Sequence, residues 1–283
     1  MKNLITKRIG HIRESGSGTR IFNALRKLRL DGIALRMMHA GDISNSKRFF
    51  TENSNRIDTV CGFLKDEISR ETFRAVVCFR QNYSRKKALE NSLLQYFPDG
   101  VITLSDEEVF IDCGAFNGDT AKKFIEKCGG NFKKIVCFEP DPANFAALDL
   151  TFSSDTRVKT IRAGVWNVNT TLKFNEGKGA GSALSNVEEK TVYVNVMAID
   201  SVESCREATF IKMDVEGAEL NALKGAKKVI ETNRPKLAIS IYHSNEELLA
   251  IPEYLHSTLV DYSFYVRHHS LNWQDTVLYA IPL

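Results

Sequence analysis

The sequence predicts an α/β fold, in which a mostly parallel sheet carries helices on both faces and follows a helical N-terminal region. Three observations support this. Beyond residue 100, short apolar runs alternate with helical stretches, as in repeated strand–helix units. Those runs are almost continuously apolar, which is typical of strands covered on both faces. Before the turn signal Pro98-Asp99-Gly100 only helical periodicity is found.

The N-terminal region, residues 1–100, is expected to be helical and to serve in substrate recognition or oligomerisation. Helical spacing of apolar residues predicts helices over 21–30, 56–64, 69–81 and 86–97. Ser69 is the expected N-cap of the third of these helices. Residues 15–18 and 41–45 are expected to be loops.

The C-terminal region, residues 101–283, carries the predicted sheet. Its expected strands are residues 108–114, 134–140, 158–166, 191–199, 208–214, 236–243, 262–268 and 276–283. Its expected helices are residues 119–128, 142–150, 218–233 and 245–259. The alternation of the two kinds of element predicts parallel strands joined by helical crossovers.

Composition narrows the class of protein. With 283 residues, 43% hydrophobic and 26% charged, the chain resembles ordinary globular proteins. No apolar run is long enough to span a membrane, and no signal-peptide core is found at the N-terminus. The six cysteines form no metal-binding spacing, which favours a reducing compartment and hence the cytoplasm. A net charge of +3 is too small to indicate a nucleic-acid partner.

Functional-looking side chains follow several of the predicted strands. Asp112 opens an Asp-x-Gly-x-x-x-Gly loop after the first strand, and Glu139 ends the second. Asp214 and His243 end two later strands. Ligands of parallel α/β sheets bind at the carboxyl ends of the strands, so these residues are expected to surround one site.

The loop after the first strand, residues 112–118, restricts the ligand. A dinucleotide-binding loop would place glycine where Phe116 stands, and Asp119 puts negative charge where a pyrophosphate would lie. A ligand with a cationic group fits better, such as a sulfonium-bearing amino acid whose ammonium Asp112 orients. A carboxylate at Glu139 is suited to accept hydrogen bonds from ribose hydroxyls.

The motifs VFIDCGAFNGDT, FEPDPANF, GSALS, TFIKMDVEGAELNALKGA, RPKLAISIYH and YVRHHS with DTVLYA together resemble the FkbM family of S-adenosylmethionine-dependent methyltransferases. The resemblance covers most of the chain beyond residue 96. It implies a seven-stranded Rossmann-like sheet of order 3-2-1-4-5-7-6 with an antiparallel last strand. It also implies S-adenosylmethionine bound by Asp112, Gly114, Ala115, Phe116, Gly118, Glu139 and Asp141.

The resemblance further implies O-methylation, often of a sugar or a related hydroxyl compound. Because a sugar hydroxyl is a poor nucleophile at neutral pH, a general base would assist. His243 is the first candidate, since histidine titrates near neutrality and this one ends a strand at the active edge. Asp214 is the second candidate.

Other residues are candidates for substrate contact, and each also has a structural interpretation. Glu216 either contacts substrate or stabilises the N-terminus of a helix through the helix dipole. His268 either binds substrate or lies in an exposed turn. Ser182 lies in a glycine-rich segment that either closes over the cofactor or forms a plain hairpin. Asp141 contacts the adenosine or caps a helix.

A divalent metal is a further possibility without a supporting ligand motif. Asp214, His243 and His268 are the residues that would hold it and acidify the sugar hydroxyl.

Two other functional classes remain open at this point. One is a dinucleotide-dependent oxidoreductase, against which Phe116 and Asp119 argue. The other is a non-catalytic interaction module that kept the fold, against which the intact ligand loop argues. The expected partners are a small-molecule or glycan hydroxyl substrate and a second copy of the chain, bound through the N-terminal helices.

Overall fold

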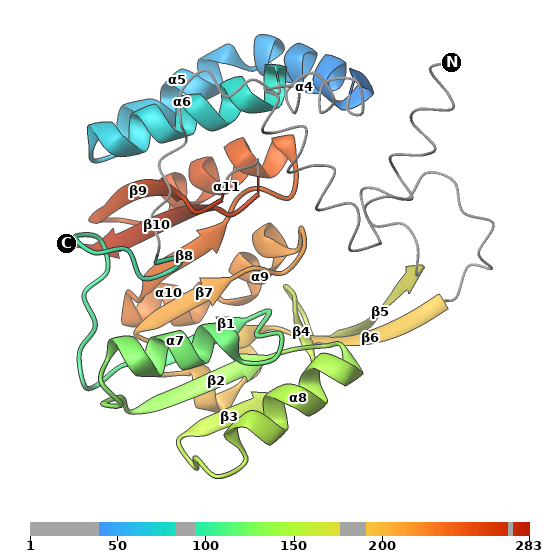
Figure 1. The fold of residues 1–283 in the computed structure, drawn as a ribbon, viewed down its shortest axis with the longest axis vertical. Helices are drawn as coiled ribbons and strands as arrows, with labels where there is room; N and C mark the ends of the chain where they lie inside the picture. Colours follow the sequence, from blue (N-terminus) through green and yellow to red (C-terminus); the bar gives the residue numbers. More distant parts are fainter. Residues whose placement is uncertain (1–39, 83–93, 176–190, 271–273) are drawn as a thin grey trace, which may run out of the picture.

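The computed structural model describes residues 40–82, 94–175, 191–270 and 274–283. A seven-stranded sheet of order β3-β2-β1-β7-β8-β10-β9 forms the centre (Figure 1). Its strands are β1 (Val109–Cys113), β2 (Lys134–Phe138), β3 (Val158–Ile161), β7 (Phe210–Met213), β8 (Lys236–Ser240), β9 (Tyr262–His268) and β10 (Thr276–Pro282). The last strand, β10, is antiparallel to both of its neighbours, β8 and β9. The predicted strand order and the antiparallel last strand are confirmed.

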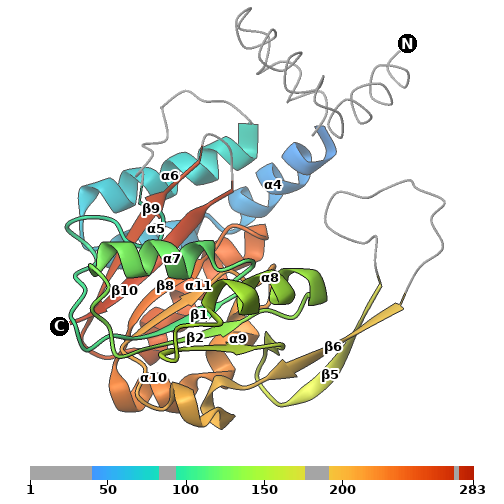
Figure 2. The ribbon, with the colours of Figure 1, turned by 60° about the horizontal axis from the view of Figure 1, so that its bottom comes forward.

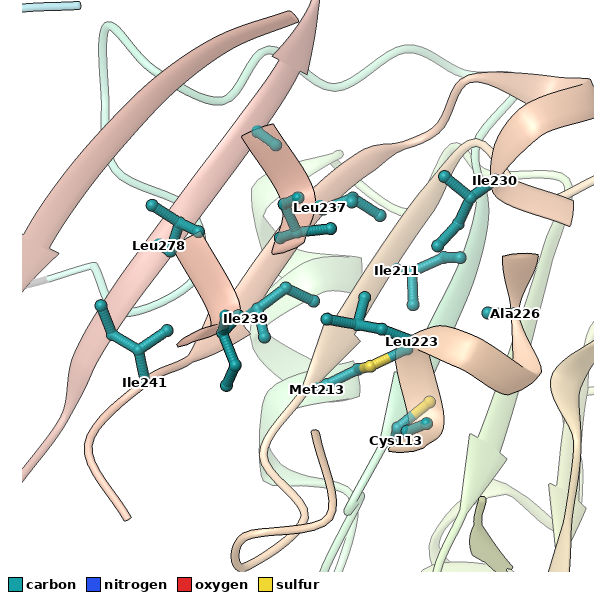
Figure 3. Close-up of a cluster of buried hydrophobic side chains, with 14 of the residues drawn as sticks. Cys113, Ile211, Met213, Leu223, Ala226, Ile230, Leu237, Ile239, Ile241 and Leu278 are labelled. Carbon is teal, nitrogen blue, oxygen red and sulfur yellow. The ribbon is translucent and has the colours of Figure 1, made fainter. Parts of the chain in front are cut away.

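Helices cover both faces of the sheet. One face carries α7 (Asp119–Lys127) and α8 (Pro142–Phe152), and the other carries α9 (Glu219–Gly225), α10 (Lys227–Asn233) and α11 (Asn245–Thr258). Alternation along each strand divides the core: Phe110 of β1 packs on the α7 side, whereas the next residue, Ile111, packs on the α9 side. On the α9 side, Leu223 lies against Met213 and Ile211 (Figure 3).

The N-terminal helices share this core. Helices α4 (Ala40–Glu52), α5 (Ser54–Phe63) and α6 (Glu67–Asn82) lie beside β9 and α11 (Figure 1). Phe50, Val60 and Phe73 are buried in the same cluster as Val266 of β9. This hydrophobic contact seats the helical layer directly on the sheet. The division of the chain at residue 100 stays a prediction.

Three local expectations for this region were wrong. Residues 41–45 belong to α4 and not to a loop. Ser69 lies inside α6, because Asp66 accepts the backbone N–H of Ser69 at 2.8 Å and so acts as the N-terminal cap. The serine hydroxyl instead accepts the backbone N–H of Val266, which ties α6 to β9. The expected loop over 15–18, the expected helix over 21–30 and residues 86–93 of the helix expected over 86–97 lie outside the described residues, and residues 94–97 form a turn and not a helix.

A second, three-stranded sheet of order β4-β6-β5 lies beside the main one. Its strands are β4 (Gly164–Val165), β5 (Thr170–Asn175) and β6 (Thr191–Met197), and β5 and β6 form an arm that projects from the body (Figure 2). The single strand expected over 158–166 is therefore divided between two sheets, and β5 was not expected. Two short 3₁₀ helices, η1 (Ile199–Ser201) and η2 (Glu203–Cys205), lead from β6 to β7.

The helix expected over 218–233 is divided into α9 and α10. A Cβ at Gly225 would lie 2.0 Å from the carbonyl oxygen of Trp166, so the backbone of α9 packs directly against the end of β4.

All six cysteines are free thiols. Within the described ranges, no helix combines the length and the apolar character needed to cross a membrane.

Candidate functional site

A cavity of about 840 Å³ opens at the carboxyl ends of β1, β2 and β7, which is the edge where parallel sheets bind ligands. This size is typical of a small-molecule site. The second sheet forms one wall through Gly164, Leu172 and Val196, together with Trp166, which follows β4. Five residues expected at the site line the cavity: Gly114, Phe116, Glu139, Asp214 and Glu216.

The loop after β1 needs glycine at two positions for different reasons. Gly114 has a φ of +79°, and a Cβ there would lie 1.9 Å from the carbonyl oxygen of Asp214. Gly118 has a φ of +87°, and its Cβ would lie 2.5 Å from the ring of Phe152. Gly114 therefore joins two strand ends closely, whereas Gly118 lets α7 pack on α8. Between them, Phe116 is 52% exposed at the cavity.

Glu139 organises the loop and still faces the cavity. Its Oε2 atom accepts the backbone N–H of Phe116 at 2.9 Å, and its Oε1 atom accepts that of Asp141 at 2.9 Å. The residue is only 6% exposed. A carboxylate oxygen has two acceptor positions, so each oxygen keeps one for a ligand. Glu139 is thus held in a fixed orientation with acceptor capacity left over.

Asp112 faces the interior and is paired with a lysine. Its Oδ1 atom lies 2.9 Å from Nζ of Lys212, and the two side chains are 0% and 2% exposed. The same Nζ donates to the carbonyl oxygen of Gly114 at 2.8 Å. Burial raises the pKa of Asp112, and the charge of Lys212 opposes this rise. Lys212 lines the cavity and Asp112 does not, so Lys212 separates the acid from the ligand space.

Asp214 lies at the cavity wall and is fixed by two tyrosines. The hydroxyl of Tyr96 donates to Oδ2 at 2.7 Å, and that of Tyr242 donates to Oδ1 at 3.0 Å. Burial and the Asp214 carboxylate raise the pKa of both phenols, so both remain protonated donors. Tyr96 comes from the segment just before residue 100, which therefore contributes directly to the site.

His243 stands beside Asp214 but does not line the cavity. Its Nε2 atom lies 3.4 Å from Oδ1 of Asp214 and 3.6 Å from Glu216, and its Nδ1 atom lies 3.1 Å from Oε1 of Glu219. Burial acts to lower the pKa of His243, but Glu219, Asp214 and Glu216 outweigh it and raise the pKa. Burial and the neighbouring Glu219 also raise the pKa of the Glu247 carboxyl.

The remaining expected site residues lie elsewhere. Asp141 caps α8 by accepting the backbone N–H groups of Ala143 and Asn144 at 2.9 Å. Ala115 is fully buried. His268 is buried at the end of β9, where its Nδ1 atom is 2.9 Å from the Thr276 hydroxyl, and it is not an exposed turn residue. Ser182 lies outside the described residues.

Three important side chains were not assigned to the site from sequence. Lys212 is a charge inside an otherwise apolar strand, which is a signal that a buried partner exists. Tyr96 lies in a segment expected to be helical, and nothing in its local pattern indicates Asp214. Glu219 stands at the start of α9, and its carboxylate accepts the N–H groups of Val215 at 2.8 Å and Gly217 at 3.0 Å, and so shapes the loop after β7.

Comparison with solved structures finds many chains that share the fold. A methyltransferase FkbM from Methylobacillus flagellatus superposes with a TM-score of 0.71 at 29% identity, and the match covers 82% of this chain and 60% of that one. This chain therefore corresponds to 60% of the length of that protein. An rRNA methylase from Streptococcus thermophilus superposes with a TM-score of 0.41 at 15% identity, over 64% of this chain and 89% of the other.

No curated protein matches the chain. The family description Methyltransferase FkbM domain matches residues 112–264, which is more than half of the sequence and includes the cavity loop, Glu139, Asp214 and His243. The chain therefore belongs to the FkbM family of S-adenosylmethionine-dependent methyltransferases.

Proposed function

We propose that this enzyme methylates a hydroxyl group of a sugar, a glycan or a related small molecule, and that it does so in the cytoplasm. The observation that carries the proposal is the Asp214 carboxylate, which lies at the wall of the 840 Å³ cavity and is held by two tyrosine hydroxyls. Free thiols at all six cysteines favour a reducing compartment.

The cavity fits S-adenosylmethionine in size and in donor set. We assign Glu139 to the ribose hydroxyls, because it is oriented by two backbone N–H groups and keeps acceptor capacity. Gly114 and Phe116 would contact the rest of the cofactor from the loop after β1. We assign Asp112 an indirect role, in which it holds Lys212 against the carbonyl oxygen of Gly114. When bound, the cofactor supplies a methyl group on a sulfonium, and the protein supplies position and a proton acceptor.

We assign contact with the acceptor hydroxyl to Asp214, ahead of His243. Asp214 lines the cavity, whereas His243 lies behind Asp214, with its Nε2 atom 3.4 Å from Oδ1 of Asp214. Near Asp214, the cavity is also lined by Asp275 and Gln95, which suit the hydroxyls of a sugar. Asp214 accepts the hydrogen bond of the reacting hydroxyl and later its proton, and His243 lies directly behind this carboxylate. Glu216, at the cavity wall, is a further candidate for substrate contact.

The test is methyl transfer from labelled S-adenosylmethionine to a panel of nucleotide sugars and oligosaccharides, read by mass spectrometry. Asp214→Asn should lower kcat by about 10²- to 10⁴-fold, which is the usual contribution of a general base to the rate. Its affinity for the cofactor should change little. His243→Ala separates the two assignments, because a larger loss than in Asp214→Asn would make the histidine the base. Transfer only to amines or to protein would refute the hydroxyl assignment.

The N-terminal helices remain the proposed dimer contact. Sedimentation equilibrium of the full chain tests this, and a monomer at all concentrations would refute it.

A further inference from the structure

Five ionisable side chains gather behind the loop that follows β7. Asp214, Glu219 and His243 each offer a ligand atom, and these atoms lie within 4.8 Å of one another. Glu216 approaches His243 from the cavity side, and Glu247 borders the group from α11. The group lies where the chain leaves β7 and β8 and enters α9 and α11.

The charge of this group is not balanced by the protein. Among the described residues, Asp214, Glu216 and Glu219 form ion pairs with His243 alone, and no lysine or arginine lies within ion-pair distance of them. Even with a protonated imidazole, Asp214 and Glu219 face a single positive charge, whereas Glu216 is 90% exposed to water. Glu219 is fully buried, so water cannot screen its charge. A cation of charge two would balance what one imidazolium cannot.

The contact geometry of His243 also favours a bound cation. Its side chain is 10% exposed, and neither ring nitrogen makes a hydrogen bond with any residue that the structure describes. Nδ1 nevertheless lies 3.1 Å from Oε1 of Glu219. The distance is short enough for a hydrogen bond, but the oxygen does not lie along the N–H direction of Nδ1. Two atoms bound to one ion at about 2.1 Å and about 90° apart lie about 3.0 Å from each other. The observed spacing matches that of two ligands of one ion; it also falls in the range of an N–H···O hydrogen bond, but the pair lacks hydrogen-bond geometry.

The carboxylates are oriented as ligands by donors on their outer side. Glu219 accepts the backbone N–H groups of Val215 and Gly217, and Asp214 accepts the hydroxyls of Tyr96 and Tyr242. Such outer donors are typical of metal sites, because they fix each ligating oxygen and leave its second acceptor position free.

We propose that Asp214, Glu219 and His243 bind a divalent cation of the Mn²⁺ class. Two carboxylates and one imidazole suit an ion intermediate between Mg²⁺, which prefers oxygen, and Zn²⁺, which accepts nitrogen readily. His268 is not part of this group. The cation holds the loop from Asp214 to Glu219 at the cavity wall and offsets the charge beside the acceptor. This role rests on the proposed function, whereas the binding site itself does not.

The test is titration of Mn²⁺ into the full chain, prepared without a histidine tag and stripped with a chelator. Free Mn²⁺ is followed by electron paramagnetic resonance. We expect one saturable site per chain, weakened more than about ten-fold in Glu219→Gln and in His243→Gln, since loss of even an outer partner of a metal ligand costs roughly that much. Glu246→Gln is the matched control, because Glu246 is an exposed acid of α11 that pairs with Arg56. This variant should bind Mn²⁺ with the affinity of the wild type.

A second readout needs no variant. In the wild type, bound Mn²⁺ should broaden the backbone amide signals of Val215 and Gly217 in nuclear magnetic resonance and leave those of α8 sharp. Absence of saturable binding of Mn²⁺, Mg²⁺ and Zn²⁺, or broadening elsewhere, would overturn the proposal, as would wild-type affinity in both ligand variants. Cofactor binding is measured on the same samples: metal binding without S-adenosylmethionine binding defeats only the proposed function, and the reverse defeats only this inference.

Discussion

Replacing Lys212 by methionine removes the positive member of the buried pair behind the cofactor loop. Nζ of Lys212 lies 2.9 Å from Asp112 and 2.8 Å from the carbonyl oxygen of Gly114, and neither side chain is exposed by more than 2%. Methionine keeps the length and apolar character of the stem, so the change isolates the charge.

The expected loss is large because Asp112 is left buried without a partner. Breaking a buried pair from one side costs about 3–5 kcal/mol, against a total stability of about 5–15 kcal/mol. With a slope of about 3 kcal/mol per molar, the urea midpoint should fall by about 1 M or more. The variant Lys133→Met is the control, since Lys133 and Glu207 are exposed and their pair should contribute about 1 kcal/mol or less.

A double variant distinguishes loss of charge balance from loss of packing. Asp112→Asn combined with Lys212→Met leaves no buried charge, and it should be more stable than Lys212→Met alone. A loss below about 1 kcal/mol in the single variant would refute the reasoning. So would a double variant whose loss is the sum of the two single losses.

Two further predictions concern the loop and the N-terminal layer. Gly114→Ala should impair folding or cofactor binding, because its Cβ would lie 1.9 Å from the Asp214 carbonyl oxygen; unchanged calorimetric binding and melting would contradict this. For Asp66, burial acts to raise the pKa, but Arg267 and Ser69 outweigh it and lower the pKa. The folded pKa is therefore below the unfolded value, so the stabilisation is present above about pH 4 and is lost as the pH falls through the folded pKa. In Asp66→Asn the free energy of unfolding should therefore fall less steeply as the pH is lowered below about 4. An unchanged dependence on pH would contradict the role given to Asp66.

Sequence reasoning predicted the main sheet because its signals are local. Each strand of the sheet is a short apolar run that ends at a turn or a helix start, and the carboxyl edge follows from parallel topology. Glu139 and Asp214 could therefore be placed at one edge without coordinates. Strand β6 was expected, but β5 was not, because β5 is partly exposed and pairs outside the main sheet.

The internal contacts of the site could not be predicted, since they join residues far apart in the chain. Tyr96 reaches Asp214 across 118 positions, and Lys212 reaches Gly114 across 98. Asp112 and His243 have the right sequence positions for ligand contact, yet their side chains pack behind Lys212 and Asp214. The end of a strand indicates which edge a residue occupies, but the packing of neighbouring side chains decides whether it faces the ligand.

The most direct test of the account is calorimetric titration of S-adenosylmethionine into the wild type and Glu139→Ala, with Glu126→Ala, an exposed acid of α7, as the control. The account predicts binding between about 1 μM and 1 mM for the wild type and the control. Loss of hydrogen bonds to a carboxylate, at about 1.5–3 kcal/mol, should weaken Glu139→Ala by roughly ten- to a hundred-fold. Equal binding by all three proteins would show that Glu139 does not bind the cofactor, and the assignment of this cavity as the cofactor site would be wrong.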